Sequence, residues 1–135
     1  MRISELLRVD ARGRVIIPLT VRNTFDLKRG MYLMMVADLE AKEISLIPFA
    51  DPGAKLVEIR ITLADMPGAL ARVATVLAAS RVDLLSTQSR TLHRGQVAEW
   101  VSIADISKCK LRLDELRTKI LGEGQAKEVK IQAYH

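Results

Sequence analysis

The sequence predicts an α+β protein made of two small domains, and three observations carry this prediction. Residues 48–54 hold two prolines and a glycine between apolar-periodic segments, which is typical of a domain boundary. Before this boundary, short β-branched stretches flank one short helical segment. After it, the hydrophobic pattern indicates the order βαββαβ, the ferredoxin-like arrangement in which two helices cover one face of an antiparallel sheet. We therefore expect one domain at residues 1–50 and a second at residues 55–135.

The first domain is expected to combine strands, a turn and one short helix. Arg8-Val9 leads into a turn that runs from Asp10 to Gly13. Pro18 suits the first position of a helix, because its missing N–H and its fixed φ fit there. The predicted elements are a first strand that includes Arg8-Val9, a strand at 14–17, a helix at 19–25, and strands at 32–36 and 43–47.

This first domain is expected to be only marginally stable by itself. A domain of about 50 residues buries a low fraction of its surface and usually depends on a disulfide, a metal or a partner. The chain has one cysteine, Cys109, and two histidines, His93 and His135, so we expect neither a disulfide nor a metal site. A second copy of the chain is then the natural partner.

The second domain shows the cleaner periodicity. Apolar and polar residues alternate from Val57 to Leu63, which predicts a strand with one buried face. From Leu70, apolar residues recur at i, i+3, i+4 and i+7, which predicts an amphipathic helix. This helix is expected to span 69–79. The elements expected after it are strands at 82–92 and 97–105, a helix that includes 113–120 and ends at Gly122, and a strand at 129–133.

The charge of the chain is concentrated at its beginning. The net charge is +5 and the pI is about 9.7, and residues 1–30 hold seven basic side chains against three acidic ones. This balance favours a polyanionic partner such as a nucleic acid. No apolar run approaches the roughly 20 residues of a membrane span, and the first residues lack the apolar stretch of a secretory signal. We therefore expect a soluble, cytoplasmic protein with no membrane partner.

Nothing in the pattern indicates an enzyme. The sequence has no clustered set of serine, histidine and acid, and no glycine loop that would hold a phosphate. Aromatic residues make up only 4% of the chain, which disfavours a platform for stacking nucleotides. We expect no catalytic residues and no cofactor.

The basic turn in the first domain has a recognisable pattern. Residues 9–18 read Val-Asp-Ala-Arg-Gly-Arg-Val-Ile-Ile-Pro, followed by Val21-Arg22 and Leu27-Lys28-Arg29-Gly30. Over residues 5–48 this pattern resembles the AbrB/SpoVT/MazE family of swapped-hairpin DNA-binding domains. The resemblance implies a β-barrel dimer of interleaved hairpins that binds double-stranded DNA. It also implies that Arg14 and Arg22 occupy positions that contact DNA and that Arg8 and Arg12 contact phosphates.

This arrangement explains why so much charge lies beside an apolar strand. In interleaved hairpins, Val15 and Ile17 face a shared core while the arginines project to an outer surface. Arginine presents five donors in a fixed geometry that matches phosphate oxygens and guanine edges. The alternative is that Arg12 and Arg14 only solvate a hairpin and pair with Asp10, as exposed ion pairs often do.

The second domain contains a loop with its own resemblance. The segment Asp65-Met66-Pro67-Gly68-Ala69-Leu70-Ala71 resembles the Asp-x-Pro-Gly-x-Leu loop of ACT domains, whose strand and helix order is also βαββαβ. The resemblance implies that an amino acid or similar metabolite binds between this loop and the start of the second strand of a neighbouring ACT unit. The expected ligand-binding residues are Asp65, Met66, Pro67, Gly68, Ala69, Leu70, Val82, Asp83 and Leu84.

The chemistry of the loop is compatible with this role. Free backbone N–H groups at a helix start attract a carboxylate, and Gly68 lets a ligand approach the backbone closely. Asp65 can then bind the ammonium group of the ligand. The alternative is an ordinary connection in which Asp65 caps the helix and Leu70 lies in the core.

Together these features predict a DNA-binding transcriptional regulator that forms a homodimer or a higher homo-oligomer. Its ACT domain would sense an amino acid or similar metabolite and modulate assembly or DNA affinity. One alternative is an antitoxin-like autoregulator, whose second half would hold a toxin. Antitoxin tails are typically short and poorly ordered, whereas residues 55–134 have the periodicity of a folded domain. The other is a non-catalytic regulatory subunit of an enzyme of amino-acid metabolism, which would have no use for the basic hairpin.

Overall fold

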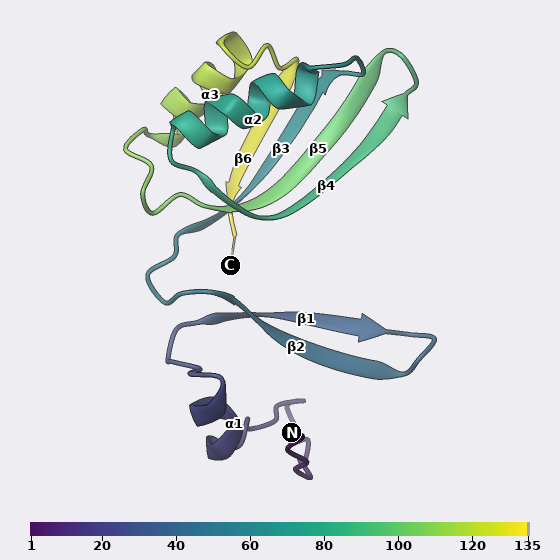
Figure 1. The fold of residues 1–135 in the computed structure, drawn as a ribbon, viewed down its shortest axis with the longest axis vertical. Helices are drawn as coiled ribbons and strands as arrows, with labels where there is room; N and C mark the ends of the chain where they lie inside the picture. Colours follow the sequence, from purple (N-terminus) through teal and green to yellow (C-terminus); the bar gives the residue numbers. More distant parts are fainter. Residues whose placement is uncertain (135) are drawn as a thin grey trace. The chain divides into compact units, whose positions relative to one another are not determined.

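The structure, a computed structural model, describes residues 1–134 and divides into two compact units. The first unit is Met1–Pro52 and the second begins at Gly53. The division falls within the stretch that contains two prolines and a glycine. Figure 1 shows the elements of each unit in chain order.

The first unit contains one short helix and a two-stranded antiparallel sheet. Helix α1 spans Leu19–Thr24, directly after Pro18, so the predicted helix is confirmed to within one residue. Strands β1 (Tyr32–Asp38) and β2 (Glu43–Ala50) form a hairpin in which Met35 lies opposite Leu46. Both predicted strands are confirmed, and each is longer than the pattern indicated.

Neither the predicted strand at Arg8-Val9 nor the predicted strand at residues 14–17 is formed in the single chain. The turn between them is closed by two backbone hydrogen bonds, Asp10 N–H to Arg14 O at 3.0 Å and Gly13 N–H to Asp10 O at 3.1 Å. Beyond this turn the structure assigns no strand to residues 14–17, because a strand requires a ladder of hydrogen bonds with a neighbour. The expected swapped-hairpin barrel is therefore not shown, and β1 and β2 form a simple hairpin sheet in its place.

The second unit has the predicted βαββαβ order. A four-stranded antiparallel sheet is arranged β4-β5-β3-β6, and helices α2 and α3 lie on one of its faces (Figure 1). The ferredoxin-like prediction is confirmed for this unit. Its elements are β3 (Leu56–Ala64), α2 (Ala69–Ala79), β4 (Asp83–His93), β5 (Val97–Asp105), α3 (Leu113–Gly122) and β6 (Glu128–Ala133).

The core of this unit lies between the helices and the sheet. Strand β3 is central, and its alternate residues from Val57 to Leu63 are buried, as the period of two predicts. Val73 and Leu77 of α2 and Leu116 and Ile120 of α3 pack onto them. This packing fixes the β3–α2 loop at one end of the sheet.

Candidate functional site

The β3–α2 loop has the backbone geometry that the Pro-Gly pair predicts. Gly68 is the N-cap residue of α2 and has a φ of +85°, in the left-handed region that favours glycine. A Cβ atom built at Gly68 would meet no heavy atom of the described residues within 4 Å. The space beside this position is therefore open to a ligand.

Asp65 ties this loop to the turn between β4 and β5. Its Oδ2 accepts a hydrogen bond from the Gly95 N–H at 2.7 Å, and its own N–H donates to Gln96 O at 3.1 Å. No side chain caps α2 among the described residues. The alternative in which Asp65 caps the helix is thus not what the structure shows. Leu70 is 39% exposed, so it is not a core residue either.

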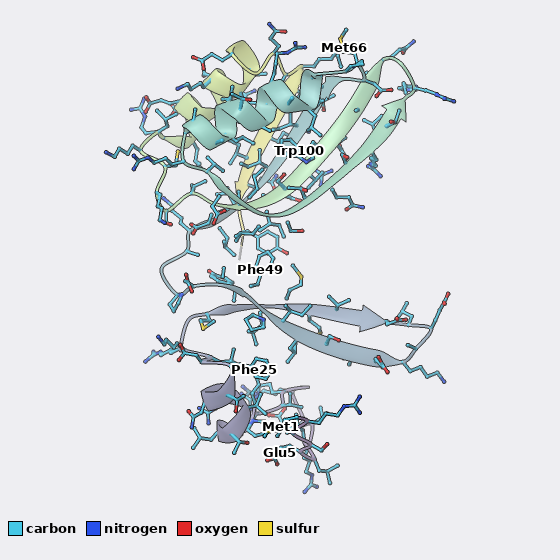
Figure 2. The ribbon with its side chains drawn as sticks, in the orientation of Figure 1. Met1, Glu5, Phe25, Phe49, Met66 and Trp100 are labelled. Carbon is cyan, nitrogen blue, oxygen red and sulfur yellow. The ribbon has the colours of Figure 1, made fainter. Side chains whose placement is uncertain are left out.

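A cleft of about 310 Å³ opens between the start of α2 and strand β4. Met66 and Trp100, both labelled in Figure 2, belong to its lining and come from the β3–α2 loop and from β5. Ser89 and Thr91 of β4 lie opposite Trp100 and Ala98 of β5. These four positions share the face of the sheet that carries the helices, because their register continues to buried β3 residues. The other lining residues are Leu63, Ala64, Asp65, Leu70, Arg90 and Glu99.

The structure brings together only part of the predicted ligand set. Asp65, Met66 and Leu70 line the cleft, and Pro67, Gly68 and Ala69 complete the adjoining loop. Val82, Asp83 and Leu84 lie at the opposite end of the sheet, where β4 begins. The reason is topological: β3 and β4 are both antiparallel to β5, so they run in the same direction, and the end of β3 lies beside the end of β4. Within one chain, the two halves of the expected site are therefore apart.

The face of the sheet away from the helices carries a charged network. Glu99 Oε1 accepts hydrogen bonds from Arg60 at 3.2 Å and from Arg90 at 3.1 Å. Arg60 also contacts Glu58 at 3.4 Å. The Glu99 side chain is only 13% exposed. A hollow of about 320 Å³ is bordered by these residues together with Gln88 and Val101, and the sequence reasoning did not single it out.

Two of the four arginines predicted to contact DNA, Arg14 and Arg22, each donate a hydrogen bond from Nε. Arg14 Nε donates to Asp10 Oδ2 at 2.8 Å, and Arg22 Nε donates to Ile17 O at 3.0 Å. Hydrogen bonds from the Arg14 backbone N–H and then from its guanidinium lower the pKa of Asp10 below its ordinary value. Arg8 and Arg12 are exposed, and the Arg12 N–H donates to Asp10 Oδ1 at 2.8 Å. The turn thus places Arg12 and Arg14 around one carboxylate.

Among residues 1–134, no group of three His, Cys, Asp or Glu side chains could hold a metal ion. None of the helices within the same range is long and apolar enough to cross a membrane.

Comparison with known families adds one finding. Residues 57–121 match the family described as the ACT domain, from the start of β3 to the end of α3. The ACT domain predicted from the sequence is thereby confirmed over these residues, and residues 1–56 lie outside the match. No curated protein is similar enough to the chain to count as a relative. The AbrB-like character of the first unit stays a prediction.

Proposed function

We propose, from the ACT domain at residues 57–121, that this protein is a regulator that senses a small effector such as an amino acid and adjusts DNA binding in response. An ACT domain indicates regulation by a small molecule of this kind. The observation that carries the proposal is the cleft beside the β3–α2 loop, which lies where the ACT resemblance expects a ligand. The protein acts as a binding module and not as a catalyst.

The proposed effector site is completed by a neighbouring copy. Strand β4 is at the edge of the sheet and has eleven residues, Asp83–His93. Antiparallel pairing of two such edges, centred near Gln88, would bring the start of one β4 beside the end of the other. Val82, Asp83 and Leu84 of the neighbour would then cover the cleft. This geometry supports a ligand bound between two ACT units, as the resemblance implies.

The proposed DNA-binding surface is the basic turn of the first unit. Arg14 and Arg22 are each oriented through Nε, which leaves the outer edge of the guanidinium directed away from that hydrogen bond. An oriented guanidinium loses less conformational freedom when it binds a guanine edge or a phosphate. Arg8 and Arg12 add positive charge beside them for phosphate contacts.

A second copy of the chain is also proposed to complete the first unit. Residues 1–52 include no buried residue, and Val9, Val15 and Ile16 are exposed. Residues 14–17 lack a strand partner within residues 1–134, and a partner hairpin would supply one. The protein is therefore proposed to be at least a homodimer through this unit.

Effector and DNA affinities are proposed to be linked. Each subunit carries a DNA-binding unit and an ACT domain, so an effector that favours one pairing of ACT domains can change assembly or DNA affinity. If the effector changes DNA affinity by a given factor, DNA must change effector affinity by the same factor.

A titration of a selected DNA duplex at fixed salt tests the DNA part of the proposal. Arg14→Ala and Arg22→Ala are each expected to cost about 1 to 3 kcal/mol of binding free energy if the side chain contacts a base edge. Arg72→Ala removes the same charge from an exposed position of α2 and is expected to change affinity little. Equal affinity in all four proteins would contradict DNA binding by the basic turn.

A second titration tests the sensor. DNA affinity and light scattering are measured with and without each of the twenty amino acids, for the parent protein and for Gly68→Val. The substitution is expected to abolish the response, because a side chain would occupy the open space at Gly68. Valine is strained at a φ of +85°, so its thermal unfolding is checked first, and Leu70→Ala serves as a second variant. The absence of any effect of amino acids would limit the ACT domain to oligomerisation.

A further inference from the structure

The hollow on the face of the sheet away from the helices has a short apolar floor and a long polar rim. Val101 of β5 lies opposite Gln88 of β4 on one side and opposite Arg60 of β3 on the other. Glu99 is two residues from Val101 on the same strand, so both side chains project from the same face. Because the valine side chain is short and its neighbours are long, a hollow of about 320 Å³ remains above it.

The rim of the hollow alternates in charge. Arg60 lies between two carboxylates, because it contacts Glu58 at 3.4 Å and Glu99 at 3.2 Å. Glu99 in turn lies between two arginines, because Arg90 contacts the same oxygen at 3.1 Å. Gln88 adds a neutral amide to these four charges. The rim therefore presents both signs of charge and has no net charge.

The charged groups of the rim keep hydrogen-bonding capacity for a ligand. Both hydrogen bonds to Glu99 use Oε1, and its Oε2 accepts none within residues 1–134. Within the same range Arg90 donates only from Nη2, although a guanidinium has five N–H donors. The Glu99 side chain is 13% exposed, so its free oxygen is held in one place. A ligand in the hollow would meet donors and acceptors that are already oriented.

This pattern constrains the charge of a ligand that fills the hollow. A cation would lie beside two arginines and an anion beside two glutamates, so a ligand with a single charge would bring an unbalanced charge into a partly dry site. A ligand that carries both signs can place its anionic group on a guanidinium and its cationic group on a carboxylate. Charge-assisted hydrogen bonds of this kind are roughly twice as strong as those between neutral groups.

We propose that this hollow is a small-molecule site whose ligand is a small zwitterion, with a carboxylate and an ammonium group close together. Arg60 and Arg90 bind the carboxylate, the free oxygen of Glu99 binds the ammonium group, and the carbon atoms lie over Val101. The volume of about 320 Å³ is at the lower end of the range of about 300 to 1,000 Å³ for small-molecule sites, which suits a ligand of this size.

The hollow differs from the cleft beside the β3–α2 loop. Arg90 and Glu99 border both, but Arg60, Gln88 and Val101 border the hollow and not the cleft. The β3–α2 loop contributes nothing to the hollow. The proposed zwitterion site therefore does not rest on the proposed effector site, and the two are tested by different variants.

A titration of the full chain with four molecules of similar size, followed by nuclear magnetic resonance, tests the proposal. Alanine carries both charges, alaninamide only the positive one, propionate only the negative one, and lactamide neither. Alanine is expected to shift the side-chain N–H signals of Gln88 and Arg60 saturably. Its dissociation constant is expected to be at least about tenfold below those of the other three, because each of them loses a charge-assisted hydrogen bond.

Two matched substitutions locate the site. Arg60 and Lys130 lie opposite each other on β3 and β6, so they share a face of the sheet, and each substitution by glutamine removes one positive charge. Only Arg60 borders the hollow. Arg60→Gln is expected to weaken alanine binding on the order of tenfold or more, whereas Lys130→Gln is expected to match the parent.

A third substitution covers the case in which Arg60→Gln does not fold, which thermal unfolding shows. Gln88 lies at an exposed position of the edge strand β4, so Gln88→Ala should leave the fold intact. It removes an amide from the rim and is expected to weaken alanine binding severalfold.

The outcomes separate this site from the proposed effector site. Equal affinity for alanine and any one of the other three molecules would overturn the zwitterion site, and so would equal weakening by Arg60→Gln and Lys130→Gln. The absence of a saturable shift at Gln88 and Arg60 would overturn it as well. Alanine binding that survives Arg60→Gln and Gln88→Ala but is lost in Leu70→Ala would place the ligand in the cleft, which would overturn this proposal and support the effector site.

Discussion

The two units of this chain contain similar kinds of residue but bury very different amounts of them. From Gly53 onward, sixteen apolar residues are buried between two helices and a four-stranded sheet. Residues 1–52 include no buried residue, although they hold fifteen of the twenty large apolar side chains that are exposed in the described chain. Apolar content alone therefore does not produce a core.

The difference lies in what each connectivity can cover. In the second unit, α2 and α3 return over the sheet and cover the face that β3, β5 and β6 present. In the first unit, a six-residue helix stands beside a two-stranded hairpin, and Phe25 of this segment remains 57% exposed. A two-stranded hairpin is marginal without further strands or helices. The second unit carries its own core, whereas the first unit has no buried residue that could form one, and the proposed second copy would supply the missing cover.

Separating the two units into fragments is expected to have the largest effect on folding and self-association. A fragment of residues 53–135 should stay folded at the lowest measurable concentration, because its core is internal. A fragment of residues 1–52 should sediment as a dimer, with an unfolding midpoint that rises with concentration. Analytical ultracentrifugation and thermal unfolding over a range of concentrations measure both. A fragment 1–52 that is folded and monomeric would contradict the proposed dimer.

Two leucine truncations sharpen the same comparison. Leu77→Ala removes a side chain that is 1% exposed and is expected to cost about 2 to 5 kcal/mol of unfolding free energy. Leu46 is 45% exposed in the single chain, so Leu46→Ala should cost less than about 0.5 kcal/mol if nothing covers it. If a partner subunit covers Leu46, the cost should instead approach that of Leu77→Ala. Chemical denaturation of both variants distinguishes the two cases.

The sequence predicts an element best where the residues that its pattern buries find their packing partners within the same chain. The alternation at residues 57–63 and the helical spacing at residues 69–79 led to elements that the structure confirms, because both patterns meet their partners within one unit. The strand expected at residues 14–17 had no such partner, so the single chain does not form it. The prediction depended on a neighbour that one chain does not contain.

The cleft was only half predictable for a different reason. The β3–α2 loop carries a local motif, but Ser89 and Thr91 join it only through the register of β4. That strand is irregular between Leu84 and Ser86, where one residue has no partner, so the period of two changes phase. Counting alternate residues from Leu84 would place Ser89 on the opposite face. The Asp65 bond to Gly95 spans thirty residues and has no local signal.

A smaller effect on stability is expected from Asp105, whose carboxylate binds the backbone near the start of the second unit. Asp105 Oδ1 accepts the backbone N–H groups of Lys55 and Ser107, both at 2.9 Å. Burial by itself raises the pKa of Asp105. The hydrogen bonds lower the pKa by a larger amount, so the net pKa is below its ordinary value. Asp105→Ala is expected to cost roughly 1 to 2 kcal/mol at neutral pH.

The sign of the pH dependence follows from that lowered pKa. The unfolded chain binds a proton at Asp105 more readily than the folded chain does, so the contribution is fully present above about pH 4 and is lost as pH falls through the folded pKa. The stability difference between the parent and Asp105→Ala should therefore narrow below pH 4. Asp105→Asn keeps an acceptor oxygen without the charge and serves as the control. A difference that stays constant from pH 7 to pH 2.5 would contradict this account.

The smallest expected effect distinguishes two buried serines of the second unit. Ser80 Oγ donates to Val76 O at 2.8 Å, whereas Ser102 Oγ is buried and has no hydrogen-bond partner within residues 1–134. A buried hydroxyl without a partner loses its hydration and gains nothing in return. Ser102→Ala is therefore expected to leave the unfolding free energy unchanged or to raise it by up to about 1 kcal/mol, while Ser80→Ala should lower it by roughly 0.5 to 1 kcal/mol. Because both side chains belong to the core of the second unit, thermal unfolding of each variant in fragment 53–135 should show the same change as in the full chain. A clear loss of stability in Ser102→Ala would mean that the hydroxyl has a partner in solution, such as a water molecule held between β5 and α2.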